Sequence, residues 1–363
     1  SLRWARHLCD TPADRYWIFV GTALLQVGAI TGLSSLAHQL TPAGWLVMQV
    51  LMAAATVPLT GGWRRSGVAG PLPGGPGLRA ALVTRFTGLT AWGLLLLCAI
   101  VGVLLLALVR QALEPIYHFD DRMYHASRVL YWIQHATVFP FETHNIRQNL
   151  VPFGSELFFL WPVLLTKSEV AGRLLFGLAL PLAAIGQYLL LRAFRLGQTA
   201  ALAGVLILVS TPLIVSSASG LKPEVWSVLS LLGLAYWAVT LCDGADRPGL
   251  RCFFLGVFAA LSTNVRSFPA ALLPGLLLIL WWAPAAAGVG ARLRAFSAGL
   301  LGAGVLSTLL IPLAFNTVHY LHPMGPPEVR RVVQAETTPQ VAYTHAIRFV
   351  SLLLELPHAP LSP

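Results

Sequence analysis

Long apolar runs without charged side chains constrain this chain most strongly. The hydrocarbon core of a bilayer is about 30 Å thick, so an α-helix needs about 20 apolar residues to cross it. Runs that reach or approach this length cover residues 16–37, 43–60, 88–109, 174–191, 196–221, 225–242, 267–291 and 295–318. Only 10% of the 363 residues are charged, against about 25% in soluble domains. The sequence therefore predicts an all-α polytopic integral membrane protein.

The formal net charge of +10 does not indicate a nucleic-acid partner. The arginines lie in short connectors between apolar runs, where positive charge sets the orientation of the helices. We therefore expect a lipid bilayer, and no nucleic acid, around this chain. The four cysteines form no CxxC pair, so the sequence indicates neither a zinc knuckle nor a disulfide framework.

Basic residues before position 16 and within the connector 61–87 place both segments in the cytoplasm. The third apolar run then delivers residues 110–149 to the outer face. The next segment, 150–166, is short and interrupted by proline and glycine, so it either crosses the membrane or lies on its surface. If it does not cross, the inner connectors that follow hold six basic residues and the outer ones hold two: Arg192, Arg195, Arg247, Arg251, Arg292 and Arg294, against Lys222 and Arg266. We favour the reading in which 150–166 does not cross the membrane.

Arg266 interrupts the apolar stretch 252–283, which therefore reads as a hairpin of two short helices, 252–265 and 267–283, with the arginine at its outer tip. The prediction is then about nine crossings. Three regions follow: an N-terminal two-span extension with its connector (1–87), a transmembrane core (88–318) that includes the external loop 110–169, and an external segment (319–363) that we expect to be cut short before further spans.

The external loop opens with two adjacent carboxylates, Asp120 and Asp121. Like charges so close together raise the pKa of one of them, as a catalytic base can require. An aspartate at a helix start also has a structural explanation, because it caps free N–H groups. The apolar residues Met123, Leu130 and Ile133 then recur at helical spacing, which predicts an amphipathic juxtamembrane helix after the third span.

Three further charges are expected at the same outer face. Lys222 and Glu224 flank a proline between two spans, where they either serve a site or simply snorkel and start a helix. Arg266 lies between apolar half-helices, which is costly unless it faces a polar cavity or anchors in the headgroup layer. Its planar guanidinium suits phosphate.

The histidines of the loop leave two alternatives open. His118, Asp121 and His125 could hold a divalent metal ion, although no established ligand spacing matches. The histidines could instead form hydrogen bonds within the loop or contact a substrate. The same loop holds further polar candidates for substrate binding: Asn145, Arg147 and Gln148.

Several local patterns follow one another along the chain: Asp120-Asp121-x-x-Tyr124-His125, Pro152-Phe153-Gly154-x-Glu156-Leu157, Glu169-x-x-x-Arg173-Leu174, Lys222-Pro223-Glu224, Leu255 through Arg266, and Asn316 through Pro327. In the order of these patterns the chain resembles the GT-C superfamily of polyprenyl-phosphate-sugar-dependent glycosyltransferases. The nearest branch contains protein O-mannosyltransferases, aminoarabinose transferases and lipopolysaccharide-core glycosyltransferases. The two-span extension precedes the span that leads into the acidic loop, where the family usually has one span in total.

The resemblance implies a GT-C-like helix bundle that transfers a sugar, with inversion, from a polyprenyl-phosphate donor to a hydroxyl of a glycan, lipid or protein. It implies Asp120 as the general base, Asp121 as its catalytic neighbour, and substrate contacts from a set of polar residues: His125, Arg147, Lys222, Glu224 and Arg266. It also implies a bacterial inner membrane with the site on the periplasmic face. A transporter or lipid flippase, with charges lining a translocation path, is the main alternative, and a scaffold without activity is another.

Overall fold

The computed structural model describes residues 11–64, 89–116, 118–244, 247–284, 288–323 and 325–327. The regular structure of these residues is helical. Most of the predicted connector 61–87 and of the external segment 319–363 lies outside the described residues, so the domain boundaries predicted there stay predictions.

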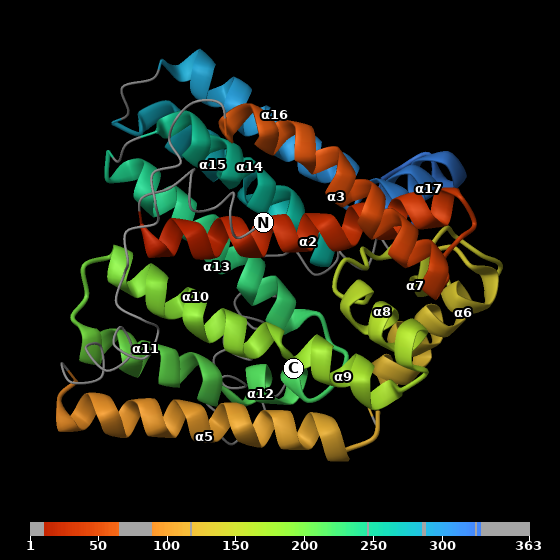
Figure 1. Ribbon diagram of the computed structural model, residues 1–363, viewed down its shortest axis with the longest axis horizontal. Helices are drawn as coiled ribbons and strands as arrows, with labels where there is room; N and C mark the ends of the chain where they lie inside the picture. Colours follow the sequence, from red (N-terminus) through yellow and green to blue (C-terminus); the bar gives the residue numbers. More distant parts are fainter. Residues whose placement is uncertain are drawn as a thin grey trace, which may run out of the picture.

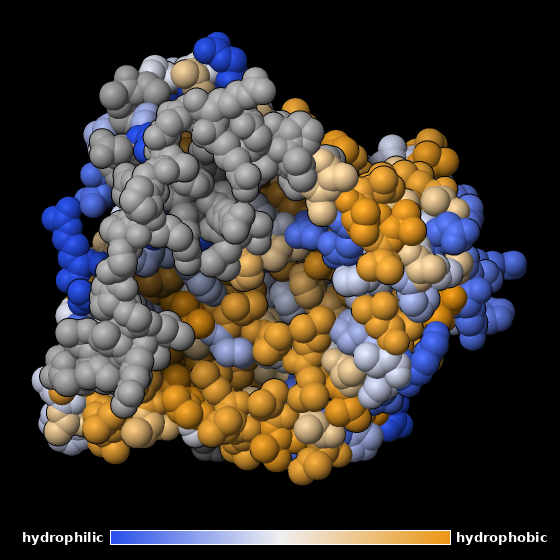
Figure 2. Space-filling view, in the orientation of Figure 1, coloured by the Kyte–Doolittle hydropathy of each residue, from blue (hydrophilic) through white to orange (hydrophobic). Residues whose placement is uncertain are grey.

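Six helices of the described chain are long and apolar enough to cross a membrane. Each contains 18 to 25 residues, or about 27–38 Å at the helical rise. They lie side by side in Figure 1, and Figure 2 shows apolar side chains across the lower part of this face and hydrophilic ones at its left and right edges. The six are α2 (Pro12–Leu36), α5 (Ala91–Leu113), α9 (Glu169–Gly177) continued by α10 (Ala179–Ala193), α13 (Glu224–Cys242), α14 (Pro248–Val265) and α16 (Val289–Leu306). The protein is therefore a polytopic helical membrane protein.

The predicted count of nine crossings is not confirmed. The run 196–221 is a pair of helices, α11 (Gln198–Ser210) and α12 (Pro212–Ala218), that bend by 62° where Pro212 removes a backbone donor. The run 295–318 is divided between α16 and α17 (Leu310–Tyr320). Two other runs form α3 (Pro42–Arg64), with a described apolar part of 42–54, and α15 (Leu273–Trp282), after the short 3-10 helix η2 (Phe268–Leu272).

Short helices gather at one end of the bundle, which we call the loop end (Figure 1). They are η1 (Asp121–Ala126), α6 (Ser127–His135), α7 (Arg147–Leu150), α8 (Leu157–Thr166) and α17. Helix α8 has 10 residues, or about 15 Å, and is too short to cross. This length favours the reading in which 150–166 stays at the membrane surface. The predicted juxtamembrane helix is present as η1 and α6, but its buried face differs from the prediction. Met123 and Leu130 are exposed, whereas Val129 and Trp132 are buried.

Helices α14 and α16 run in the same direction, because contacts between them keep a nearly constant sequence offset. Gly256 packs on the backbone at Leu300, and the Thr308 hydroxyl lies 3.4 Å from Asn264 Oδ1. The chain between the two helices must therefore return to the end from which α14 started. This return leg contains η2 and α15 and begins at Arg266, as the hairpin prediction requires.

The crossing of α14 and α16 depends on glycine. A Cβ at Gly299 would overlap the carbonyl oxygen of Phe253. We expect Gly299→Ala to lower the free energy of unfolding by about 1–3 kcal/mol, because the two backbones would have to separate. Gly302→Ala, on the same helix with open space around it, is the matched control. Thermal unfolding in detergent measures both, and equal stability of the two variants would contradict this close packing.

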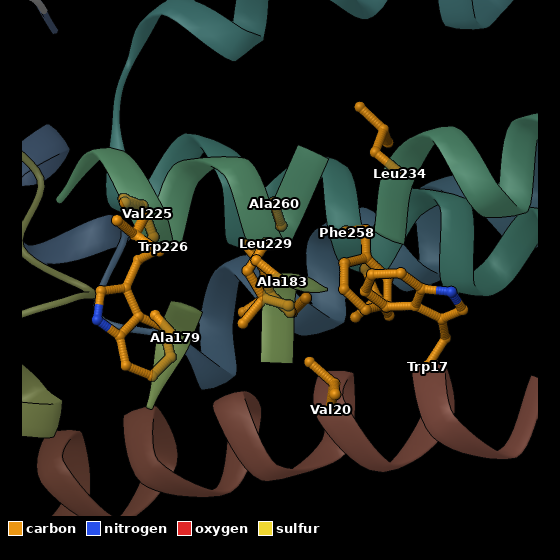
Figure 3. Close-up of a cluster of buried hydrophobic side chains, with 14 of the residues drawn as sticks. Trp17, Val20, Ala179, Ala183, Val225, Trp226, Leu229, Leu234, Phe258 and Ala260 are labelled. Carbon is orange, nitrogen blue, oxygen red and sulfur yellow. The ribbon is translucent and has the colours of Figure 1, made fainter. Parts of the chain in front are cut away.

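Aromatic and small residues fill the centre of the bundle. The ring of Trp17, on α2, meets that of Phe258, on α14, edge to face at 5.5 Å (Figure 3). Gly233 of α13 and Gly186 of α10 leave the space that these two rings occupy. The aromatic pair therefore ties α2, α10, α13 and α14 into one core.

The end of the bundle opposite the loop end is held by its own charged groups. Asp14, at the start of α2, accepts a 2.8 Å hydrogen bond from the Tyr236 hydroxyl and lies 3.5 Å from the Arg251 guanidinium. Arg195, just after α10, pairs at 2.8 Å with Asp243, just after α13. The connectors that carry these arginines thus share an end with the N-terminus of α2, as the charge count predicts when 150–166 does not cross.

Candidate functional site

Segments far apart in the sequence meet at the loop end. The hydroxyl of Tyr124, in η1, is influenced by the charges of Arg266, Asp120 and Glu156. The backbone N–H of Gly154 donates a 2.9 Å hydrogen bond to the Asn264 carbonyl, at the end of α14. The backbone N–H of Leu221, shortly after α12, donates to the Asp121 carboxylate of η1. The end of α14, the start of α8 and the loop after α12 therefore lie next to η1. Helix η1 is a π-helix, a form that often marks functional sites.

Asp121 is fully buried and is held by the loop between α12 and α13. Its Oδ2 accepts a 2.9 Å hydrogen bond from the backbone N–H of Leu221. The neighbouring Gly220 makes room for this carboxylate, since a Cβ there would overlap Oδ2. Among the described residues, Oδ1 of Asp121 has no hydrogen-bond partner. A buried acceptor without a partner is rare and indicates a place for a ligand group or a proton.

Burial raises the pKa of Asp121, and the Leu221 N–H together with three basic side chains opposes this rise. Those side chains are His125, His118 and Lys222. The predicted Asp121, His125 and Lys222 are thus neighbours, and a raised pKa is what a group that exchanges protons needs.

Asp120 is exposed at the start of η1, and its side chain makes no capping hydrogen bond. The carboxylate of Asp121 is bonded outside its own helix. The capping explanation therefore applies to neither aspartate. Burial raises the pKa of Tyr124, which Arg266 lowers and Asp120 raises further, so the charges of Asp120 and Arg266 act on one hydroxyl.

We call the charged and polar side chains around η1 the cluster: Asp120, Asp121, Tyr124, His125, Lys222, Glu224 and Arg266. Its arginine and its lysine differ in their partners. Arg266 forms an ion pair with Glu224, across the ends of α14 and α13. The second carboxylate oxygen of Glu224 is buried and has no hydrogen-bond partner within the described chain. Lys222 is half-buried, and among the described residues its ammonium group makes no hydrogen bond or ion pair. Lys222 is therefore a cation that a bound anion can use.

A buried ionic network lies behind η1. His125 Nδ1 and Glu156 Oε1 are 2.7 Å apart, and both residues are less than 4% exposed. The other Glu156 oxygen accepts a 2.9 Å hydrogen bond from the Ser155 hydroxyl, and Arg128 approaches Oε1 at 3.3 Å. Burial alone would raise the pKa of Glu156, but Arg128, His125 and Ser155 together lower it to about 2. Glu156 is therefore ionised at neutral pH.

Two polar residues of the loop hold η1 in place. The side-chain amides of Asn145 and Gln148 donate to the Met123 carbonyl at 3.2 and 3.1 Å. Arg147 between them is exposed, and its guanidinium makes no hydrogen bond or ion pair with the described residues. The structure therefore does not bring Arg147 into the cluster.

The divalent-metal alternative finds little support in the described residues. They contain no group of three or more His, Cys, Asp or Glu side chains placed to hold a metal ion. His125, one of the three candidate ligands, instead has its Nδ1 bound to Glu156.

An apolar groove lies on the lateral face of the bundle, near the loop end. It has a volume of about 190 Å³ and lies between α5, the junction of α9 and α10, and Ala218 of α12. Its one amide-bearing side chain is Gln111, near the end of α5. Gln111 Nε2 lies 3.5 Å from the carbonyl of Gly220, next to the residues that hold Asp121. An alkyl chain in this groove would therefore bring its polar end to the acidic and basic side chains.

Sequence reasoning missed Gln111, Arg128 and Glu156 as members of the site. Glu156 was visible as an acid in an apolar segment, but nothing in the sequence paired it with Arg128 and His125. Gln111 stood just after an apolar run, at the start of the loop 110–149, with nothing to single it out. Comparisons with protein-family models, curated proteins and solved structures find no match to this chain.

Proposed function

We propose that this protein is a membrane glycosyltransferase, which moves a sugar from a polyprenyl-phosphate donor to a hydroxyl acceptor at the loop end. The observation that carries the proposal is the apolar groove that ends beside a cluster of acids and bases. A long isoprenoid chain needs such a groove open to lipid, and its phosphate needs cations at the groove's end. The ammonium group of Lys222 and the guanidinium of Arg266 provide them.

In this proposal each side chain has a distinct task. Asp120 is exposed to water and takes the proton of the acceptor hydroxyl. The acceptor oxygen then attacks the anomeric carbon in one displacement with inversion, and polyprenyl phosphate leaves. Lys222 and Arg266 stabilise the charge that develops on the departing phosphate. Asp121, which the Leu221 N–H fixes in place, contacts the sugar or the acceptor.

The positions of charge favour this reading over a transporter or flippase. A translocation path needs ionisable groups near the middle of the bilayer. In the six long helices of the described chain, the charged residues lie within two turns of a helix end: Asp14, Arg15, Arg110, Glu169, Arg173, Arg192, Glu224, Arg251, Arg292 and Arg294. The middle of the bundle is apolar. This arrangement supports chemistry at a membrane face. We further propose that this face is the periplasmic side of a bacterial inner membrane.

Binding of the leaving group tests the proposal. We expect the protein in nanodiscs to bind polyprenyl phosphate and to prefer it to the uncharged polyprenol, as measured by native mass spectrometry. Lys222→Ala should weaken binding of the phosphate about tenfold or more, the usual value of a hydrogen bond to a charged group. Arg266→Ala should weaken donor binding more than acceptor binding.

The chain offers a matched control, because its one other lysine, Lys167, is exposed at the end of α8. Lys167→Ala should leave binding unchanged. Equal affinity for polyprenol and polyprenyl phosphate, or equal effects of the two lysine substitutions, would contradict the proposed phosphate site.

A further inference from the structure

Glu156 is placed to control the histidine beside the acidic pair. It is 1% exposed at the start of α8, and its two carboxylate oxygens contact His125, Ser155 and Arg128. Buried charges are costly, and two apolar side chains of similar volume often stabilise a fold as well as a buried ion pair does. The need for stability therefore does not account for an ionic network at this position.

Arg128 keeps the Glu156 carboxylate charged. Its guanidinium lies 5.6 Å from the ring centres of Trp132 and Phe153 and 5.9 Å from that of Tyr124. It also donates a 3.2 Å hydrogen bond to the Val151 carbonyl. An arginine does not lose its proton in a protein, so Glu156 faces a permanent cation on one side and the imidazole on the other.

An ionised carboxylate accepts hydrogen bonds and donates none. The short contact between Glu156 and His125 Nδ1 therefore requires the proton to be on Nδ1. In the neutral ring, Nε2 is then an acceptor. Within the described chain Nε2 makes no hydrogen bond.

We propose that Glu156 is a positioning residue, which fixes the His125 imidazole so that Nε2 accepts a hydrogen bond from a hydroxyl group of the bound substrate. The groups that face the imidazole are Glu156, Asp121 and the ring of Tyr124 at 4.1 Å, with Arg128 behind Glu156. Within the described chain none of them donates a hydrogen bond to Nε2, so a substrate hydroxyl fits there. The inference rests on the proposed function for the identity of that hydroxyl, as part of a sugar or its acceptor.

The first test uses the wild-type protein without substrate. Nitrogen NMR of ¹⁵N-histidine-labelled protein in nanodiscs, with His125→Gln to assign the signal, reports which ring nitrogen carries the proton. For the neutral ring we expect a protonated Nδ1 and a bare Nε2. A proton on Nε2, or an even mixture of the two tautomers, would overturn the inference.

The second test removes the carboxylate without leaving a buried charge behind. The double variant Arg128→Met/Glu156→Leu replaces the ion pair by apolar side chains and should fold. We expect its KM to rise about tenfold, the loss of one substrate hydrogen bond, with a smaller change in kcat. The fixed tautomer should also be lost. An unchanged KM and tautomer in the folded double variant would overturn the inference.

A matched control exists on α9, where Glu169 and Arg173 form another ion pair at 3.2 Å with Arg173 buried. Glu169→Leu/Arg173→Met should change neither the His125 tautomer nor KM. The NMR result needs no turnover. If the wild-type protein transfers no sugar, the proposed function fails, and the tautomer alone decides whether Glu156 positions His125.

Discussion

Asp120→Asn is expected to lower the rate of sugar transfer by about 10²–10⁴-fold, the usual contribution of a general base. Folding should be unaffected, because the Asp120 side chain is exposed and makes no capping hydrogen bond. The amide of asparagine has nearly the same shape as the carboxylate but does not accept a proton. Single-turnover transfer measures the rate, and thermal unfolding in detergent measures the fold.

The control for Asp120→Asn is Glu142→Gln, which neutralises another exposed acid of the same loop. It should leave the transfer rate within about twofold. A near wild-type rate in Asp120→Asn would remove Asp120 from the role of base. Asp121 would then be the remaining carboxylate of the pair, with its pKa already raised by burial.

Arg128→Ala is expected to destabilise the fold by about 3–5 kcal/mol, the usual cost when one partner of a buried ion pair is removed. The side chain is 0% exposed, and its loss would leave the Glu156 carboxylate without its cation. The pKa of Glu156, now about 2, would rise towards its usual range. Reversible unfolding in mixed detergent micelles gives the free energy.

The comparison for Arg128→Ala is Arg195→Ala. Arg195 also pairs with an acid, Asp243, but its side chain is 80% exposed. Exposed ion pairs contribute about 0–1 kcal/mol, so this variant should unfold almost as the wild type does. A loss of less than about 1 kcal/mol in Arg128→Ala would show that the buried network carries no stability.

The long helices could be predicted from the sequence because the signal is physical and local. An uncharged run of about 20 residues has few alternatives to a membrane helix. The return of the chain at Arg266 was predictable for the same reason, since an arginine is expensive in the middle of a span. Sorting basic residues by connector also grouped Arg195 and Arg251 at one end of the bundle, where the structure has them.

The breaks within spans were harder to predict. Pro212 gave a signal for the bend between α11 and α12, but hydrophobicity alone joined the two helices into one run. Ser307 ends α16 without proline or charge, so the run 295–318 looked continuous. Hydropathy records which residues avoid water and carries no information on helix direction.

The members of the cluster were only partly predictable. Acids and bases of the outer loops stand out in a chain with few charges, which pointed to Asp121, Lys222 and Arg266. The network of Arg128 and Glu156 depends on how α6 and α8 fold onto each other, 28 positions apart in the sequence. A contact of this kind has no local pattern, and α6 alone reads as an amphipathic surface helix.

The most direct test of the proposed function is turnover. Purified protein in liposomes should be incubated with a panel of polyprenyl-phosphate sugars and simple hydroxyl acceptors, with release of polyprenyl phosphate as the measurement. We predict release from at least one donor by the wild type, a product of inverted anomeric configuration, and release at least about 100-fold slower by Asp120→Asn. Movement of a donor across the bilayer without any release of polyprenyl phosphate would contradict the proposed transferase and favour a transporter.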